Sequence, residues 1–163
     1  TVPGRMRALG LSEDEAMGAV GAFVLTGTET IVSFLPRMIA LLVDSGWMAR
    51  LRTEPDRVDA AIAEGLRVTT PSPVMLRSVA APASIGSLAV RRGERVILAT
   101  FLANAAAGAF DPEGNPAASL TMAQVRATLD ALLAVDDLRI VSRRAARGVL
   151  IPSYASLHVA GAA

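Results

Sequence analysis

The pattern of apolar and polar positions along the chain predicts a long central helix near its start. Residues 16–43 are almost continuously apolar, which is typical of a helix that runs through the interior of a protein. Ser12, followed three residues later by Glu15, predicts a capping box at the N-terminus of this helix, and Gly46 predicts its end. The central helix is therefore expected over about residues 12–45.

Apolar residues at helical spacing predict two further helices, and a shorter one is expected over residues 100–107. Pro55 at a first helical position opens a helix over about residues 55–68, and a last helix is expected over about residues 120–134. The apolar faces of these two helices consist of Val58, Ile62, Leu66, and of Val125, Leu129, Leu132.

Short strands are predicted in the remaining segments. Residues 91–94 are expected to form a hairpin-like turn between two strands in the segment 85–98, with Gly93 supplying a positive φ. Residues 70–73 are expected to be an extended connector, because each proline restricts the residue before it. An arginine-rich turn at residues 143–147 is expected between C-terminal strands in the segment 138–159. The expected strands are residues 85–90, 95–98, 138–142, 149–151 and 156–159.

These elements predict one domain over residues 1–163, mainly α with small β-sheets, an α+β fold. The length and the 52% of hydrophobic residues against 19% of charged residues are typical of a folded domain with a sizeable core. A net charge of +1 without a basic stripe argues against a nucleic-acid partner. The absence of cysteine excludes disulfides, zinc–thiolate and iron–sulfur sites, and cysteine nucleophiles.

The apolar stretch is also long enough to raise the possibility of a membrane span. Glu29, Pro36 and Arg37 argue against one, because a central charge costs roughly 2.5 to 3.5 kcal/mol in lipid and Pro36 is expected to interrupt the helix. We expect no membrane partner and a cytoplasmic location. The N-terminus lacks a signal-peptide pattern and a starting methionine, so we expect a mature or truncated piece of a protein.

Two polar motifs occur within the predicted helices. Gly27, Glu29 and Thr30 lie in the middle of the long apolar helix, and Glu64 precedes Arg67 by three positions, on one helical face. Taken alone, the first motif is compatible with threonine hydroxyls bonding back to the helix and with a Glu29–arginine pair. Taken alone, the second is a common surface pattern.

Together with residues further along the chain, the two motifs resemble a known family. The two motifs are followed along the chain by Pro71-Ser72-Pro73, Arg77 and Ala103-Asn104. This order is similar to that in the C-terminal half of bacterial cytochrome P-450 monooxygenases. In that family the long helix crosses the haem, its acid–alcohol pair relays protons, and the Glu-x-x-Arg pair braces the core. The resemblance implies vestigial oxygen-activation positions at Gly27, Glu29 and Thr30, a structural brace of Glu64 and Arg67, and a vestigial haem-propionate position at Arg77.

The chain departs from the family's pattern after Asn104, where three alanines stand. The family's Arg-Asp-Pro, its meander and its haem loop with the ligating cysteine are missing together. Without the thiolate the monooxygenase chemistry cannot run. His158, the one histidine, occupies a predicted strand position and cannot substitute. We therefore expect no haem cofactor, no metal ligands, no catalytic residues and no enzymatic activity.

Two explanations of the missing loop remain open. The first is a pseudoenzyme that resembles the haem-less actinobacterial homologues of the family. These homologues bind and activate a deoxysugar glycosyltransferase in macrolide or anthracycline antibiotic biosynthesis. Thr28 and residues 44–47 match that subgroup. The alternative is a haem-thiolate monooxygenase whose haem loop is missing from the sequence. A decayed gene product or an unrelated helical binding module also stays open.

An apolar helix such as residues 16–43 needs a cover, because an exposed apolar patch promotes association. The expected partner is a glycosyltransferase in a hetero-oligomer, with the N-terminal half of the same protein or a homodimer as alternatives. The arginines of residues 143–147 are expected to form a solvated turn, with the docking of an acidic partner as the alternative.

Overall fold

The structure is a computed structural model that describes residues 2–113, 123–147 and 152–162. Within these ranges the chain combines helices with three two-stranded antiparallel sheets. The helices are α1 (Val2–Ala8), α2 (Glu13–Asp44), α3 (Trp47–Thr53), the 3-10 helix η1 (Pro55–Arg57), α4 (Val58–Thr69), α5 (Thr100–Ala106) and α6 (Ala123–Leu133). The predicted central, Glu-x-x-Arg, short and last helices are all present within a few residues of their expected bounds.

The long helix α2 begins at the predicted capping box. The backbone N–H of Ser12 donates to Glu15 Oε2 at 2.8 Å, and the backbone N–H of Glu15 donates to Ser12 Oγ at 3.3 Å. Gly46, with a φ of 76°, lies just past its end as expected. The expectation that Pro36 interrupts the helix is wrong, since α2 continues through it. Burial of the flanking Phe34 and Met38 outweighs the loss of one backbone hydrogen bond.

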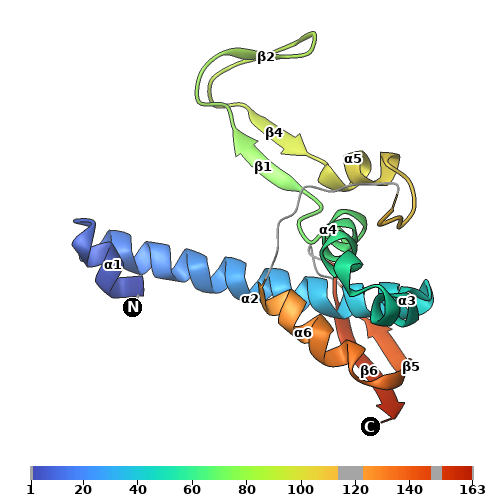
Figure 1. Cartoon of the computed structure of the whole chain (residues 1–163). Helices are drawn as coiled ribbons and strands as arrows, with labels where there is room; N and C mark the ends of the chain where they lie inside the picture. Colours follow the sequence, from blue (N-terminus) through green and yellow to red (C-terminus); the bar gives the residue numbers. More distant parts are fainter. Residues whose placement is uncertain (1, 114–122, 148–151, 163) are drawn as a thin grey trace.

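The strands of the middle segment pair differently from the prediction. Strand β1 (Met75–Ser78) pairs with β4 (Arg95–Leu98), and β2 (Ala83–Ile85) pairs with β3 (Leu88–Val90). The predicted strand 85–90 is broken at Gly86, and the predicted hairpin between 85–90 and 95–98 is wrong. Gly93 has the predicted positive φ, 89°, but its turn leads from one sheet to the other. Residues 83–90 are thus an excursion from the β1–β4 ladder, as Figure 1 shows.

The C-terminal strands form one long hairpin of β5 (Asp136–Ala145) and β6 (Tyr154–Ala162). The predicted turn at residues 143–147 is wrong in its first part, because Arg143 and Arg144 lie within β5 and pair across with Leu157 and Ser156. The predicted strand at residues 149–151 lies outside the described residues.

The hydrophobic core lies where the C-terminal half of α2 meets α3, α4 and α6 (Figure 1). Its largest fully buried apolar side chains are Phe34, Met38, Leu42, Leu51, Val58, Ile62, Val125 and Leu129. The N-terminal half of α2 extends away from this core with α1 folded against its end, and Met17 and Val24 are 66% and 61% exposed. The expectation of an interior helix therefore holds only for the C-terminal half of α2.

Among the described residues, no single helix has the length and hydropathy of a membrane span. One pair of helical segments meets these criteria of length and composition when the two are taken together. The pair consists of Ile31–Asp44 and Trp47–Thr53, which are bent by 87° relative to each other.

Candidate functional site

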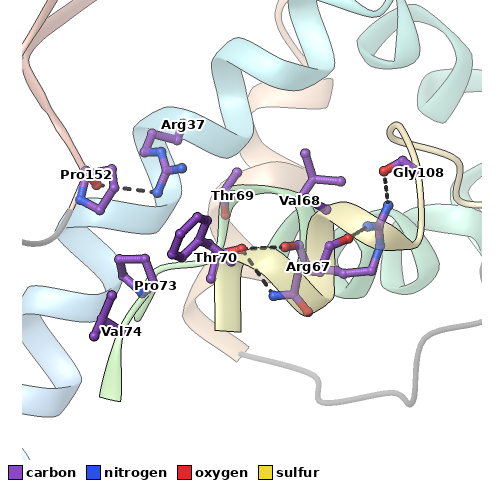
Figure 2. Close-up of a pocket in the computed structure, with 12 residues that line it drawn as sticks. Arg37, Arg67, Val68, Thr69, Thr70, Pro73, Val74, Gly108 and Pro152 are labelled. Atoms are coloured by element: carbon purple, nitrogen blue, oxygen red, sulfur yellow. Dashed lines mark hydrogen bonds between the residues drawn. The ribbon is translucent and has the colours of Figure 1, made fainter. Parts of the chain in front are cut away.

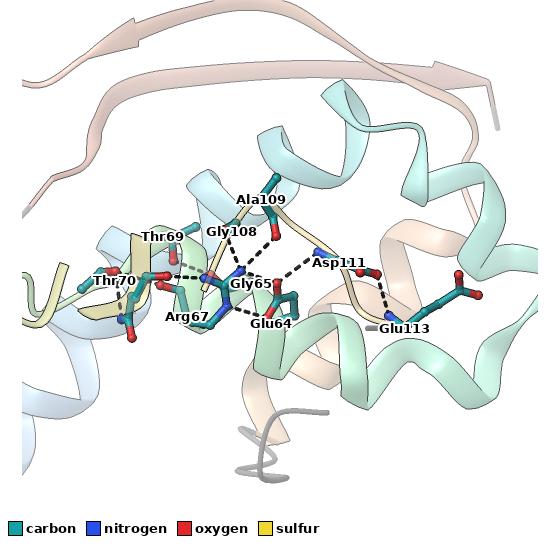
Figure 3. A network of polar contacts seen from close by, with 10 residues as sticks. Glu64, Gly65, Arg67, Thr69, Thr70, Gly108, Ala109, Asp111 and Glu113 are labelled. Carbon is teal, nitrogen blue, oxygen red and sulfur yellow. Dashed lines mark hydrogen bonds and ion pairs between the residues drawn. The ribbon is translucent and has the colours of Figure 1, made fainter. Parts of the chain in front are cut away.

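Glu64 and Arg67 form a buried ion pair on α4. Their spacing of three residues places both on one face of the helix, as the sequence predicts. Arg67 donates from Nε to Glu64 Oε2 at 2.8 Å and from a terminal nitrogen to Oε1 at 2.5 Å. The Glu64 side chain is 0% exposed, so this pair is part of the interior rather than a surface pattern (Figure 3).

The end of α5 and the segment that follows it lie over this ion pair. Arg67 also donates to the carbonyl oxygens of Asn104, Gly108 and Ala109, the last two at 3.1 and 3.0 Å. The backbone N–H of Asp111 donates to Glu64 Oε1 at 3.0 Å. The hydrogen bond to Glu64 raises the pKa of Arg67 above its usual value, so the guanidinium stays charged. Backbone groups of the same chain thus hydrogen-bond to both members of the pair (Figure 3).

Aromatic and ionic contacts hold the same segment from the side of α3. The Phe110 ring meets Trp47 edge-on with centroids 5.9 Å apart, and the Arg50 guanidinium lies 4.5 Å from the centre of the Trp47 ring. Glu113 forms ion pairs with Arg50 and with Arg57, the latter at 3.1 Å. Residues 104–113, which we call the closing segment, are therefore anchored at both α4 and α3.

A cavity of about 600 Å³ lies beside the ion pair, between α2, α4 and α5 (Figure 2). Its polar lining includes Arg37, Arg67, Thr70 and Asn104, and Phe101 contributes to its apolar lining. Asn104 donates from its amide nitrogen to Thr70 Oγ1 at 3.1 Å. This lining offers hydrogen bonds and apolar surface but no nucleophile paired with a base, so it is suited to binding rather than to acid–base catalysis.

The other predicted site residues are dispersed. Gly27, Glu29 and Thr30 lie along α2, and their side chains are outside the described part of the structure. Arg77 is exposed on β1, and its hydrogen bonds go to its neighbours, the carbonyl oxygen of Leu76 at 2.9 Å and the sulfur of Met75 at 3.6 Å. The structure thus brings Glu64 and Arg67 together and shows Arg77 on a separate strand.

The residues present do not fit a haem held by a thiolate. Residues 107–122, which connect α5 to α6, contain neither cysteine nor histidine. His158 is an exposed residue of β6, opposite Ser142. A haem iron held by a thiolate is ligated by a cysteine, and the sequence contains none.

Several residues of the site have no signature in the sequence. The carbonyl oxygens that accept from Arg67 belong to Asn104, Gly108 and Ala109, and backbone acceptors carry no residue-type signal. Arg37 carries a signal, a cation inside an apolar helix, but in the sequence alone it argues only against a membrane span.

Comparisons with known proteins agree with the fold. No family model matches the chain. A curated relative, the biotin biosynthesis cytochrome P-450 of Bacillus subtilis (strain 168), is 30% identical over 95 residues, which is 58% of this chain and 24% of the relative.

Two solved structures are similar over nearly the whole chain. CalO2 matches with a TM-score of 0.81 and 22% identity over 96% of this chain and 46% of its own. The cytochrome P-450 enzyme CYP109B1 from Bacillus subtilis matches with a TM-score of 0.78 and 22% identity over 91% of this chain and 47% of its own. The chain therefore has a cytochrome P-450 fold and spans about half the length of these structures. The expected fold class is confirmed.

Proposed function

We propose that this chain uses a cytochrome P-450 fold to bind a protein partner instead of a haem. The observation that carries the proposal is the closing segment. Its backbone groups hydrogen-bond to both members of the buried Glu64–Arg67 pair, and the connection to α6 that continues it contains no cysteine. A fold that keeps its internal brace but lacks the iron ligand retains a scaffold suited to recognition, since fold and chemistry are separable.

The proposed partner is a deoxysugar glycosyltransferase of macrolide- or anthracycline-type antibiotic biosynthesis, the class that the sequence resemblance implies. Exposed apolar side chains supply contact surface on two parts of the molecule, including Val24 and Val32 on α2 and Leu88 and Ile97 on the small sheets. Apolar surface of this kind is typical of protein–protein contact sites. The expected assembly is a hetero-oligomer.

An activator of this kind acts by binding the active conformation of the transferase more tightly than the inactive one. A hundredfold activation requires a difference of only about 2.7 kcal/mol between the two binding free energies. Such a difference is within reach of a few buried contacts, and no residue of this chain then needs to touch the sugar.

A second candidate is a haem-thiolate monooxygenase whose haem loop is missing from the sequence. The similarity to cytochrome P-450 enzymes favours it. The haem content of the protein expressed from its complete gene separates the two candidates. We expect the purified protein to show no Soret band; a Soret band that shifts when the reduced protein binds carbon monoxide would overturn the haem-less proposal.

The partner is tested with a deoxysugar glycosyltransferase of the proposed biosynthetic class. We expect the two proteins to elute together on gel filtration, and sugar transfer, followed by mass spectrometry, to be faster in the complex than with the transferase alone. Separate elution with equal transfer rates would reject the proposal. Co-elution without a rate change would favour a stabilising role, in which case the transferase alone should aggregate on standing.

A further inference from the structure

Arg37 occupies an unusual position at the edge of the cavity between α2, α4 and α5. It is a partly buried cation on an otherwise apolar stretch of α2, and it lines the cavity together with Thr70 and Phe101. Its hydrogen bond is a long one, 3.4 Å to the carbonyl oxygen of Pro152, which also accepts a bond of 2.5 Å from Ser33. Figure 2 shows the guanidinium directed toward Pro152.

The charge of Arg37 is not neutralised by the described residues around it. Arg67, the other cation of the cavity, is paired with Glu64, and the carboxylate of Asp44 at the end of α2 is paired with Arg143. The described ion pairs include none to Arg37. Burial lowers the pKa of Arg37, and the electrostatic interaction with Tyr154 partly offsets this shift. An arginine nevertheless stays protonated in proteins, so a partly buried positive charge remains at the cavity.

The rest of the lining is largely apolar or already satisfied. Asn104 and Thr70 bond to each other, and Thr70 Oγ1 donates to the carbonyl oxygen of Arg67 at 2.8 Å. Pro73 and Val74 contribute apolar surface. The cavity therefore combines one unneutralised guanidinium with an apolar wall, in a volume within the range of small-molecule sites.

We propose that this cavity binds a small amphiphilic carboxylate, with the carboxylate on Arg37 and the apolar body along Pro73, Val74 and Phe101. A carboxylate accepts two parallel hydrogen bonds from a guanidinium, and this pairing offsets the cost of burying the cation. The site goes beyond the proposed partner binding and does not depend on it.

The probes are octanoate and 1-octanol, which share an apolar chain and differ in the head group. Isothermal titration calorimetry of the purified chain should show octanoate binding at least about tenfold more tightly than 1-octanol, the factor expected for a charge-assisted hydrogen bond. Arg37→Gln should remove this preference. Arg92→Gln, which changes an exposed arginine of the turn between β3 and β4, should leave it unchanged.

Two further measurements keep the test decisive. Arg37→Gln should melt close to the parent, because it removes a partly buried charge and one long hydrogen bond rather than an ion pair. Ala105→Phe, which fills the cavity from α5 without changing any charge, should weaken the binding of both probes. Equal affinity for octanoate and 1-octanol, or unchanged octanoate binding in Arg37→Gln or Ala105→Phe, would overturn the proposal. These readouts need no transferase, so they fail or succeed separately from the proposed activation.

Discussion

At the scale of the residue, burial determines how much the Glu64–Arg67 pair contributes to the stability of the fold. An exposed pair of this spacing contributes at most a few tenths of a kcal/mol, roughly 0.3 to 0.5. Here the carboxylate is fully buried, and both partners are hydrogen-bonded to the closing segment. Removing one partner therefore leaves the other as an unpaired charge in the interior.

Glu64→Ala should destabilise the chain by about 3 to 5 kcal/mol, the cost of breaking a buried pair. Urea denaturation followed by circular dichroism measures this change. The matched control is Asp130→Ala, which removes an acid that is 52% exposed and pairs with Arg126 four residues earlier; it should change the free energy of unfolding by less than about 1 kcal/mol. Equal stability of both variants would contradict the buried brace.

Gly65 is a second residue whose role depends on its neighbour. It lies on the buried face of α4, where an added Cβ would come within 2.0 Å of the sulfur of Met38. We expect Gly65→Ala to destabilise by about 1 to 3 kcal/mol, despite the better helix propensity of alanine, because Met38 is fully buried and cannot move freely.

Thermal or urea unfolding tests this prediction against Gly18→Ala on α2, where an added Cβ meets no atom within 4 Å. That control should be neutral or stabilising by up to about 1 kcal/mol. In a Met38→Ala background the cost of Gly65→Ala should largely vanish. If it persists there, the close approach of α2 and α4 is not its cause.

At the scale of the element, α2 begins at a pH-sensitive cap. The backbone hydrogen bond from Ser12, and secondly its hydroxyl, lower the pKa of Glu15 from its ordinary value of 4.5. Since the pKa in the folded helix lies below that of the unfolded chain, ionised Glu15 favours the capped helix. Its contribution is fully present above pH 4.5 and is lost as the pH falls through the lowered pKa.

An NMR titration of the Glu15 carboxylate should therefore give a midpoint below 4.5. Ser12→Ala removes the hydroxyl but keeps the backbone donor, so it should return the midpoint only part of the way. A midpoint at the ordinary value in the parent would show that the capping box is not formed in solution.

At the scale of the whole molecule, one stripe of α2 lies on the surface without cover. Met17, Val24, Thr28 and Val32 recur at helical spacing and are exposed, beyond the part of α2 that crosses the core. The similar solved structures are about twice as long as this chain. We expect the purified chain to self-associate or to bind a partner through this stripe, because contiguous exposed apolar surface favours association.

Val24→Lys should shift the mass measured by light scattering toward that of the monomer without lowering the melting temperature, because Val24 is 61% exposed. Val141→Lys is the matched control, since Val141 is 62% exposed but lies on β5. It should leave the mass unchanged. The same shift in both variants would indicate a nonspecific effect of charge and argue against the stripe.

The sequence by itself determined the elements that local interactions stabilise. Local interactions within a few residues produce the capping box at Ser12, the end of α2 at its glycine, and the apolar faces of α4 and α6. These features can therefore be predicted from a single sequence. The ion pair of Glu64 and Arg67 belongs to the same class, because helical spacing alone brings the two side chains together. The absence of a thiolate ligand is also a property of the sequence.

Only the tertiary structure decided which segments meet across long distances. It continued α2 through Pro36 because burial outweighs one lost hydrogen bond, and it paired β4 with β1 rather than with the adjacent strand. It also decided that Glu64 is buried and that Arg37 reaches a cavity. These outcomes depend on backbone partners and on burial, which the identity of a residue does not encode and which arise only when distant segments pack together.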